Sequence, residues 1–276
     1  MTSPAELRAE RDGAGRLSPW VVFYVLVLLA WLALALMAED TAPSAAGALD
    51  FSTTAALWRA LCLAAADAAL LPLTAMWSVM ALAMMAPTAV PMLSTYRDIT
   101  SSPRADRPAL SFWALLGGYL AVWIAFALAA AALQQGLSHA GLLGPGGLSL
   151  SDGLSAALLL GAGLYQLSPL KEACLRRCRS PFAYFMAHWQ DGPRGAFRMG
   201  LAQGAACLGC CWALMLLGFV GGTMNLAWMA GATVLMTLEK LDWPGRALTR
   251  PLGAVLIAAG IAVAARGFGL IQGGLT

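Results

Sequence analysis

Long apolar runs separated by short polar segments dominate the chain, and several windows of about 20 residues contain almost no charge. A helix of that length is what a chain needs to cross the hydrocarbon core of a bilayer. The pattern therefore predicts an all-α protein, a polytopic transmembrane helical bundle. We expect seven spans, at residues 19–38, 72–93, 110–133, 154–173, 197–219, 223–239 and 251–272.

The positions of the basic residues predict an orientation, because cytoplasmic loops of membrane proteins are enriched in lysine and arginine. If the N-terminus lies in the cytoplasm, all 17 lysines and arginines except Arg59 and Arg266 fall on the cytoplasmic side. An odd number of spans preserves this asymmetry. We therefore expect a multi-pass protein of the cell inner membrane with a cytoplasmic N-terminus and the lipid bilayer as its surroundings.

The domain organisation follows from the same pattern. We expect a cytoplasmic tail over residues 1–18, a single transmembrane domain over 19–272 and a short tail over 273–276. The cytoplasmic segment 174–196 is too short to form a hydrophobic core of its own. Apolar residues make up 60% of the chain and the formal net charge is +3. Because topology already accounts for the basic residues, no nucleic-acid partner is expected.

Three cysteines in the fifth expected span form the most informative cluster. On a helix, Cys207, Cys210 and Cys211 fall within an arc of about 100°, and the same face carries Gly200 and Gly204. Larger apolar residues occupy the opposite face. Since lipid offers nothing to a small, sulfur-rich stripe, the stripe should face other helices. Thiolates are the preferred ligands of soft metal ions such as Cu(I).

Methionines in the second expected span could join this cysteine stripe. Met80 and Met84 lie one turn apart on one helix face. Met84 and Cys207 each lie about ten residues from the cytoplasmic end of their spans, which is about 15 Å along the helix axis. Thioether and thiolate ligands together suit Cu(I), but methionine stripes also serve as ordinary core packing. The sequence leaves both interpretations open.

A second cysteine pair, Cys174 and Cys178, follows Pro169 at the cytoplasmic end of the fourth expected span. If the helix continues, both thiols lie on one face among basic residues, which favour thiolates. We expect this pair to be reduced and accessible near the inner surface, where His188 could complete a metal-binding set. Glu239, near the cytoplasmic boundary, is expected to form a structural pair with Lys240 or with a neighbouring basic loop.

Several ordered motifs resemble a bacterial family of predicted metal-binding integral membrane proteins with no assigned function. The motifs are Met80-Ala-Leu-Ala-Met-Met-Ala-Pro87, Tyr165-Gln-Leu-Ser-Pro-Leu-Lys171 and Gly209-Cys-Cys-Trp-Ala-Leu-Met215. The resemblance covers about residues 75–240. It implies that Cys174, Cys178, Cys207, Cys210 and Cys211 are the recurring cysteines of the family, and it implies no reaction.

The leading hypothesis is a membrane protein that binds a soft metal, copper in the form of Cu(I), for transport or for metallation of a metalloprotein or membrane-complex partner. The candidate metal ligands are Cys207, Cys210, Cys211, Cys174, Cys178, Met80 and Met84. No catalytic residue and no nucleotide-binding motif is found in the sequence. Two alternatives stay open: a structural subunit or assembly factor without metal, and a thiol–disulfide or quinone-linked oxidoreductase.

Overall fold

The structure is a computed structural model, and it describes residues 4–39, 70–100 and 107–267. Within these ranges the chain is helical, and its β-structure amounts to an isolated bridge between Leu143 and Ser149. The prediction of an all-α bundle is therefore confirmed. The helices are α1 Pro4–Glu39, α3 Leu70–Met85, η1 Pro87–Ala89, α4 Val90–Thr100, α5 Pro108–His139, η2 Pro145–Gly147, α6 Asp152–Gln166, α7 Pro169–Arg179, α8 Pro181–His188, α9 Gly192–Leu216, α10 Gly218–Gly221, α11 Leu226–Glu239 and α12 Asp242–Gly267.

The number of helices able to cross a membrane lies between four and six in the described residues, against the seven spans expected. Four helical segments are long and apolar enough, and they are Pro19–Met37, Pro108–His139, Gly192–Gly221 and Ala247–Gly267. Two bent pairs also qualify if each counts as one span: α3 with η1 and α4, bent by 41°, and α6 with α7, bent by 63°.

The differences from the expected spans have local causes. Pro87 and Pro169 each begin a new helix, because proline has no N–H to donate to the preceding turn. The second and fourth expected spans are therefore broken. The sixth corresponds to α11, whose 14 residues are fewer than the about 20 that span a bilayer. Residues 268–272 of the seventh expected span, and the tail 273–276, lie outside the described residues.

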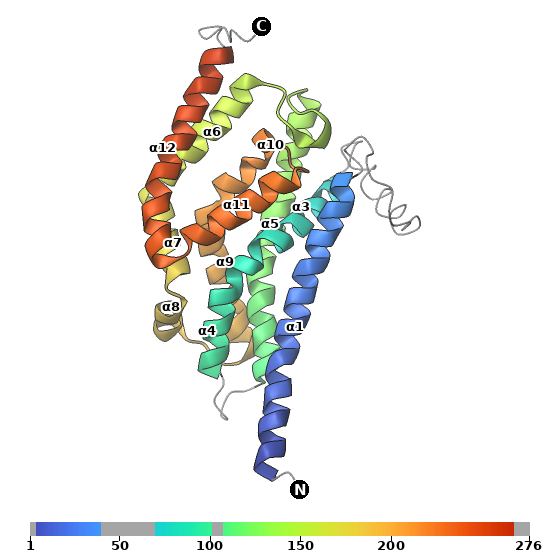
Figure 1. The fold of residues 1–276 in the computed structure, drawn as a ribbon, viewed down its shortest axis with the longest axis vertical. Coiled ribbons are helices and arrows are strands. Elements are labelled where there is room, and N and C mark those ends of the chain that lie inside the picture. Colours follow the sequence, from blue (N-terminus) through green and yellow to red (C-terminus); the bar gives the residue numbers. More distant parts are fainter. Residues whose placement is uncertain (1–3, 40–69, 101–106, 268–276) are drawn as a thin grey trace.

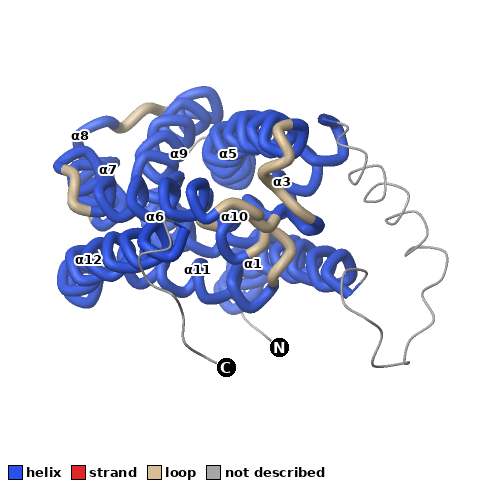
Figure 2. Tube along the Cα trace, turned by 90° about the horizontal axis from the view of Figure 1, so that it is seen from above, coloured by secondary structure: helices blue, strands red, loops and turns tan. Residues whose placement is uncertain are grey.

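The helices are arranged in two rows when the bundle is viewed from one end (Figure 2). One row contains α7, α9, α5 and α3, and the other contains α12, α11 and α1, with α6 and α10 between them. The start of α1 and the end of α12 lie at opposite ends of the molecule (Figure 1).

Helices α5 and α9 pack against each other with their backbones in contact, and glycines make this approach possible. A Cβ added at Gly118 would collide with the backbone of Phe197 and would lie 2.9 Å from the nitrogen of Leu201. One added at Gly200 would collide with the carbonyl of Leu115. Small residues allow this kind of close helix contact in membrane proteins. The contact fixes α9, which carries three cysteines, against α5.

The break between α3 and α4 leaves backbone groups that need partners. The carbonyl of Met85 accepts hydrogen bonds from the Thr88 hydroxyl at 2.8 Å and from the Tyr119 hydroxyl at 3.0 Å. Both hydroxyls are buried, so they supply the bonds that water would otherwise make. This places two polar side chains from the break and from α5 beside the cysteine face of α9.

Candidate metal centre

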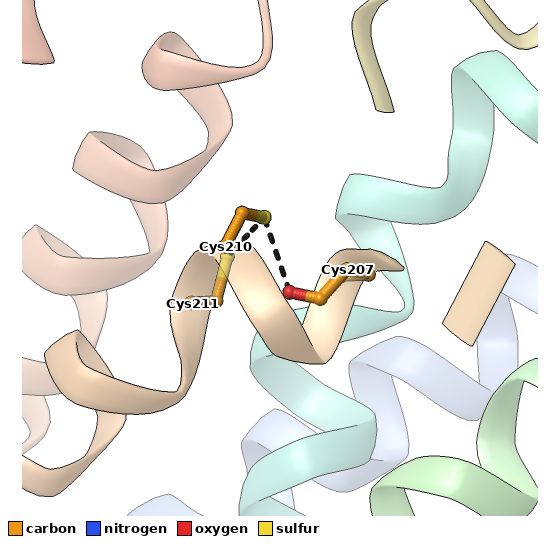
Figure 3. Close-up of side chains that lie close together, drawn as sticks. All are labelled: Cys207, Cys210 and Cys211. Atoms are coloured by element: carbon orange, nitrogen blue, oxygen red, sulfur yellow. Dashed lines mark hydrogen bonds between the residues drawn. The ribbon is translucent and has the colours of Figure 1, made fainter. Parts of the chain in front are cut away.

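Three thiols gather on one face of α9, at Cys207, Cys210 and Cys211 (Figure 3). Each residue is at most 2% exposed, so the prediction that the stripe faces the bundle interior is confirmed. Their sulfur atoms all lie within 4.8 Å of one another. Two metal–sulfur bonds of about 2.3 Å span about 4.6 Å when they are collinear. The separation therefore suits two-coordinate binding of a soft ion between a pair of these thiols.

The three cysteines do not have equal surroundings. The thiol of Cys210 donates to the carbonyl of Cys207 at 3.1 Å and lies 3.2 Å from the sulfur of Cys211. A thiol that already has a backbone acceptor is satisfied in its protonated form. Cys207 instead receives hydrogen bonds from outside its helix. The surroundings of Cys207 therefore differ from those of Cys210.

Lys240 is the residue of this site that sequence reasoning missed. Its ammonium donates to the sulfur of Cys207 at 3.0 Å and to the hydroxyl of Thr88 at 2.6 Å. The hydroxyl of Tyr119 also lies 3.0 Å from the sulfur of Cys207. The sequence suggested Lys240 only as one possible ion-pair partner of Glu239, and it gave no reason to expect a contact between the lysine and α9.

The pair Cys174 and Cys178 lies beside the stripe rather than forming a separate site. The bend between α6 and α7 brings both residues, each half-buried, against α9. Cys178 interacts with the thiols of Cys207 and Cys210. A Cβ added at Gly209 would lie 2.5 Å from the sulfur of Cys174. These five cysteines are all free thiols, and Cys62 lies outside the described residues.

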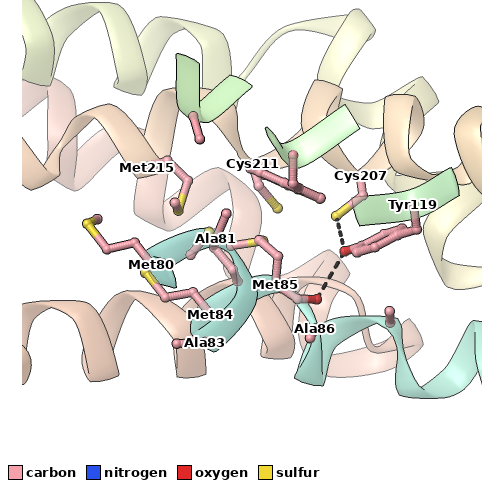
Figure 4. Packing of buried hydrophobic residues seen from close by; sticks show 14 of the residues in the cluster. Met80, Ala81, Ala83, Met84, Met85, Ala86, Tyr119, Cys207, Cys211 and Met215 are labelled. Atoms are coloured by element: carbon pink, nitrogen blue, oxygen red, sulfur yellow. Dashed lines mark hydrogen bonds between the residues drawn. The ribbon is translucent and has the colours of Figure 1, made fainter. Parts of the chain in front are cut away.

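Met80 and Met84 are buried on α3 and belong to the same core cluster as the cysteines (Figure 4). Met85 lies beside them and supplies the backbone carbonyl that Tyr119 and Thr88 contact. The structure thus places the methionine face of α3 within the core that contains the cysteine stripe. The role of Met80 and Met84 as metal ligands remains a prediction.

His188 and Glu239, which the sequence analysis also considered, both lie outside the thiol cluster. His188 is exposed on α8 and stacks on Tyr184, with ring centroids 5.0 Å apart, so it is outside the thiol cluster. Glu239 is 1% exposed and forms an ion pair with Lys171 at 2.8 Å, and Gln166 bonds to both side chains. Lys171 belongs to the neighbouring basic segment, so the prediction of a structural pair for Glu239 is confirmed.

A small cavity reaches the cysteine stripe from the side of α4 and α7. Its volume is about 30 Å³, and Met92, Cys178, Gln203, Cys207 and Lys240 are among its lining residues. The side-chain oxygen of Gln203 is buried and has no hydrogen-bond partner among the described residues. A space of this size holds an ion or one or two waters. The cavity therefore has room for a small cation beside Cys207.

The all-helical bundle, with its long apolar helices, encloses a three-thiol cluster of the kind that can bind a soft metal ion. Comparison with known families agrees with this class, because residues 74–263 match the family model described as PpoB2, copper chaperone. The match covers more than half of the chain, and the chain belongs to this copper chaperone family. Neither a curated protein nor a solved structure matches the chain significantly.

Proposed function

We propose that this chain is a multi-pass inner-membrane copper chaperone that holds Cu(I) between Cys207 and Cys211. Cys210 would be a secondary ligand, and Met80 or Met84 a weak third one. The observation that carries the proposal is the group of three buried thiols within 4.8 Å of one another in a chain of the copper chaperone family. Thiolate and thioether sulfur are soft ligands, and Cu(I) is the soft ion that they suit.

The proposal includes seven membrane crossings with a cytoplasmic N-terminus. Four straight spans, two bent pairs and α11 as a short crossing make up this number. The start of α1 and the end of α12 lie at opposite ends of the bundle, as an odd number of crossings requires (Figure 1). The distribution of lysine and arginine supports the same orientation.

Copper would move by exchange between thiolates. Cys178 lines the cavity that reaches Cys207, and Cys174 packs one turn away on α7. In each exchange a new copper–sulfur bond forms as an old one breaks, so the copper stays Cu(I) and no oxidant or reductant is needed. This series of exchanges would connect the buried site with a cytoplasmic donor or with the metalloprotein or membrane-complex partner that receives the ion.

Elemental analysis of the full-length protein, purified in detergent after growth with copper, tests the proposal. The double variant Cys207→Ser/Cys211→Ser should lose its copper, while the control Cys62→Ser should retain as much as the parent. Circular dichroism should show the same helical content for all three proteins. Equal copper in the double variant and the parent would favour the alternative in which the small-residue stripe of α9 serves only its contact with α5.

A further inference from the structure

Lys240 lies at the end of α11 and reaches across to the cysteine helix. Its two hydrogen bonds, to Cys207 and Thr88, both come from its ammonium group. The neighbouring Glu239 is not available to neutralise it, because that carboxylate pairs with Lys171. The ammonium of Lys240 therefore faces the sulfur of Cys207, to which it donates a hydrogen bond.

The Thr88 hydroxyl holds the ammonium in this position. It accepts a hydrogen bond from Lys240 and donates its own proton to the carbonyl of Met85. That carbonyl is held at the break between α3 and α4, where Tyr119 also bonds to it. The ammonium of Lys240 is therefore positioned through Thr88 by a backbone carbonyl, unlike that of a mobile surface lysine.

The charge of the loaded site depends on Lys240. Two thiolates and one monovalent cation have a net charge of −1, and the ammonium brings the total to zero. With a divalent cation the same set of groups has a net charge of +1. A bare charge in a low-dielectric interior costs several kcal/mol, so the neutral combination is favoured.

We infer that Lys240 is a specificity-determining residue that makes the thiol site prefer monovalent soft cations over divalent ones. The inference rests on the proposed function and deepens it. Lys240 does not bind the ion, because an ammonium has no lone pair. It acts as a fixed counter-charge at the wall of the cavity that Cys207 also lines.

The test measures binding of Cu(I) and Cd(II) to the full-length protein in detergent, with chelators competing for each metal. Lys240→Met should weaken Cu(I) binding by about 10- to 100-fold, the usual effect of losing an outer-sphere partner of a metal site. Binding of Cd(II) should stay equal or become tighter, since two thiolates neutralise a divalent ion without the lysine. Lys240→Arg, which keeps the charge, should restore most of the preference for Cu(I).

Arg250→Met is a matched control, because it removes a charge from an exposed position of α12. It should leave the affinities for both metals unchanged. A Lys240→Met protein with unchanged Cu(I) affinity would overturn the inference alone, as would an equal loss of both metals. Failure of the parent protein to bind Cu(I) would overturn the proposed function and the inference with it.

Discussion

Two groups of buried polar side chains lie at the same end of α11, and consecutive residues contribute to them. Glu239 joins Lys171 and Gln166 in an ion-pair cluster, and Lys240 joins Cys207 and Thr88 in the thiol site. In the ion-pair cluster, opposite charges are in direct contact and one amide bonds to both. In the thiol site, a cation faces sulfur, and a cavity opens beside it.

The difference distinguishes a structural cluster from a candidate binding site. Buried opposite charges whose hydrogen bonds are satisfied have no capacity left for a ligand, and here they connect α7 with α11. The thiol site has three sulfur atoms with soft-ligand character and an adjacent buried amide oxygen, from Gln203, that has no hydrogen-bond partner among the described residues. A buried polar atom without a hydrogen-bond partner is a reason to expect a bound water or ion beside it.

The largest effect should come from breaking the ion-pair cluster. Glu239→Leu leaves Lys171 buried without its partner, and we expect the free energy of unfolding to fall by about 3–5 kcal/mol. Denaturant unfolding in detergent measures this loss. The double variant Lys171→Met/Glu239→Leu should recover much of it, because no unpaired charge remains. A single variant as stable as the parent would contradict the structural assignment of this cluster.

The next effect should appear inside the thiol site and distinguish its members. Cys207→Ser removes a proposed ligand, and we expect the Cu(I) affinity to fall by more than the about 10- to 100-fold typical of a lost outer-sphere partner. Cys210→Ser should stay within or below that range, because its thiol already bonds to the carbonyl of Cys207. Competition with a Cu(I) chelator gives both values, and equal losses would show that Cys210 is a full ligand.

A smaller effect is expected at Tyr119, which contacts both the thiol site and the break in the helix. Tyr119→Phe removes a hydrogen bond to the carbonyl of Met85, and Thr88 still bonds to that carbonyl. We expect the free energy of unfolding to fall by only about 0.5–1.5 kcal/mol. Thermal unfolding monitored by circular dichroism measures it. A loss as large as that of Glu239→Leu would mean that the two clusters are not energetically distinct.

The smallest equilibrium effect is expected for Cys178→Ser. Since Cys178 lines the same cavity as Cys207 and is proposed to pass copper to it without being one of the two ligands, the final copper content should be unchanged while loading becomes slower. Stopped-flow transfer from a Cu(I)–chelator complex would follow the rate. A large loss of bound copper at equilibrium would instead make Cys178 a ligand of the resting site.

The sequence was sufficient for the features that depend on local periodicity. The apolar windows predicted the helical class, and the spacing of Cys207, Cys210 and Cys211 predicted a buried stripe. It was not sufficient for the breaks. Pro169 indicates that a helix begins there, but the direction of the 63° bend depends on packing against α9, so the meeting of Cys178 with the stripe was not foreseen.

The number of spans and the contacts of Lys240 also depend on features that local periodicity does not predict. Residues 223–239 read as a full span because apolar residues continue through them, whereas the helix itself covers only Leu226–Glu239. Lys240 read as an ordinary basic residue at the membrane boundary. Its aim at Cys207 depends on Thr88, which is 152 residues away in the chain and reaches this position because of the break at Pro87. No local pattern encodes such a contact.

The backbone contact between α5 and α9 has a consequence for how a carrier can release its cargo. Gly118 and Gly200 bring the backbones of α5 and α9 into contact, and the proposed ligands Cys207 and Cys211 both lie on α9. Two other segments beside the site, η1 with α4 and α7, each follow a bend in the chain, of 41° and 63°. We therefore expect that η1, α4 and α7 move away from α9 when the ion is released, while Cys207 and Cys211 keep their spacing on α9.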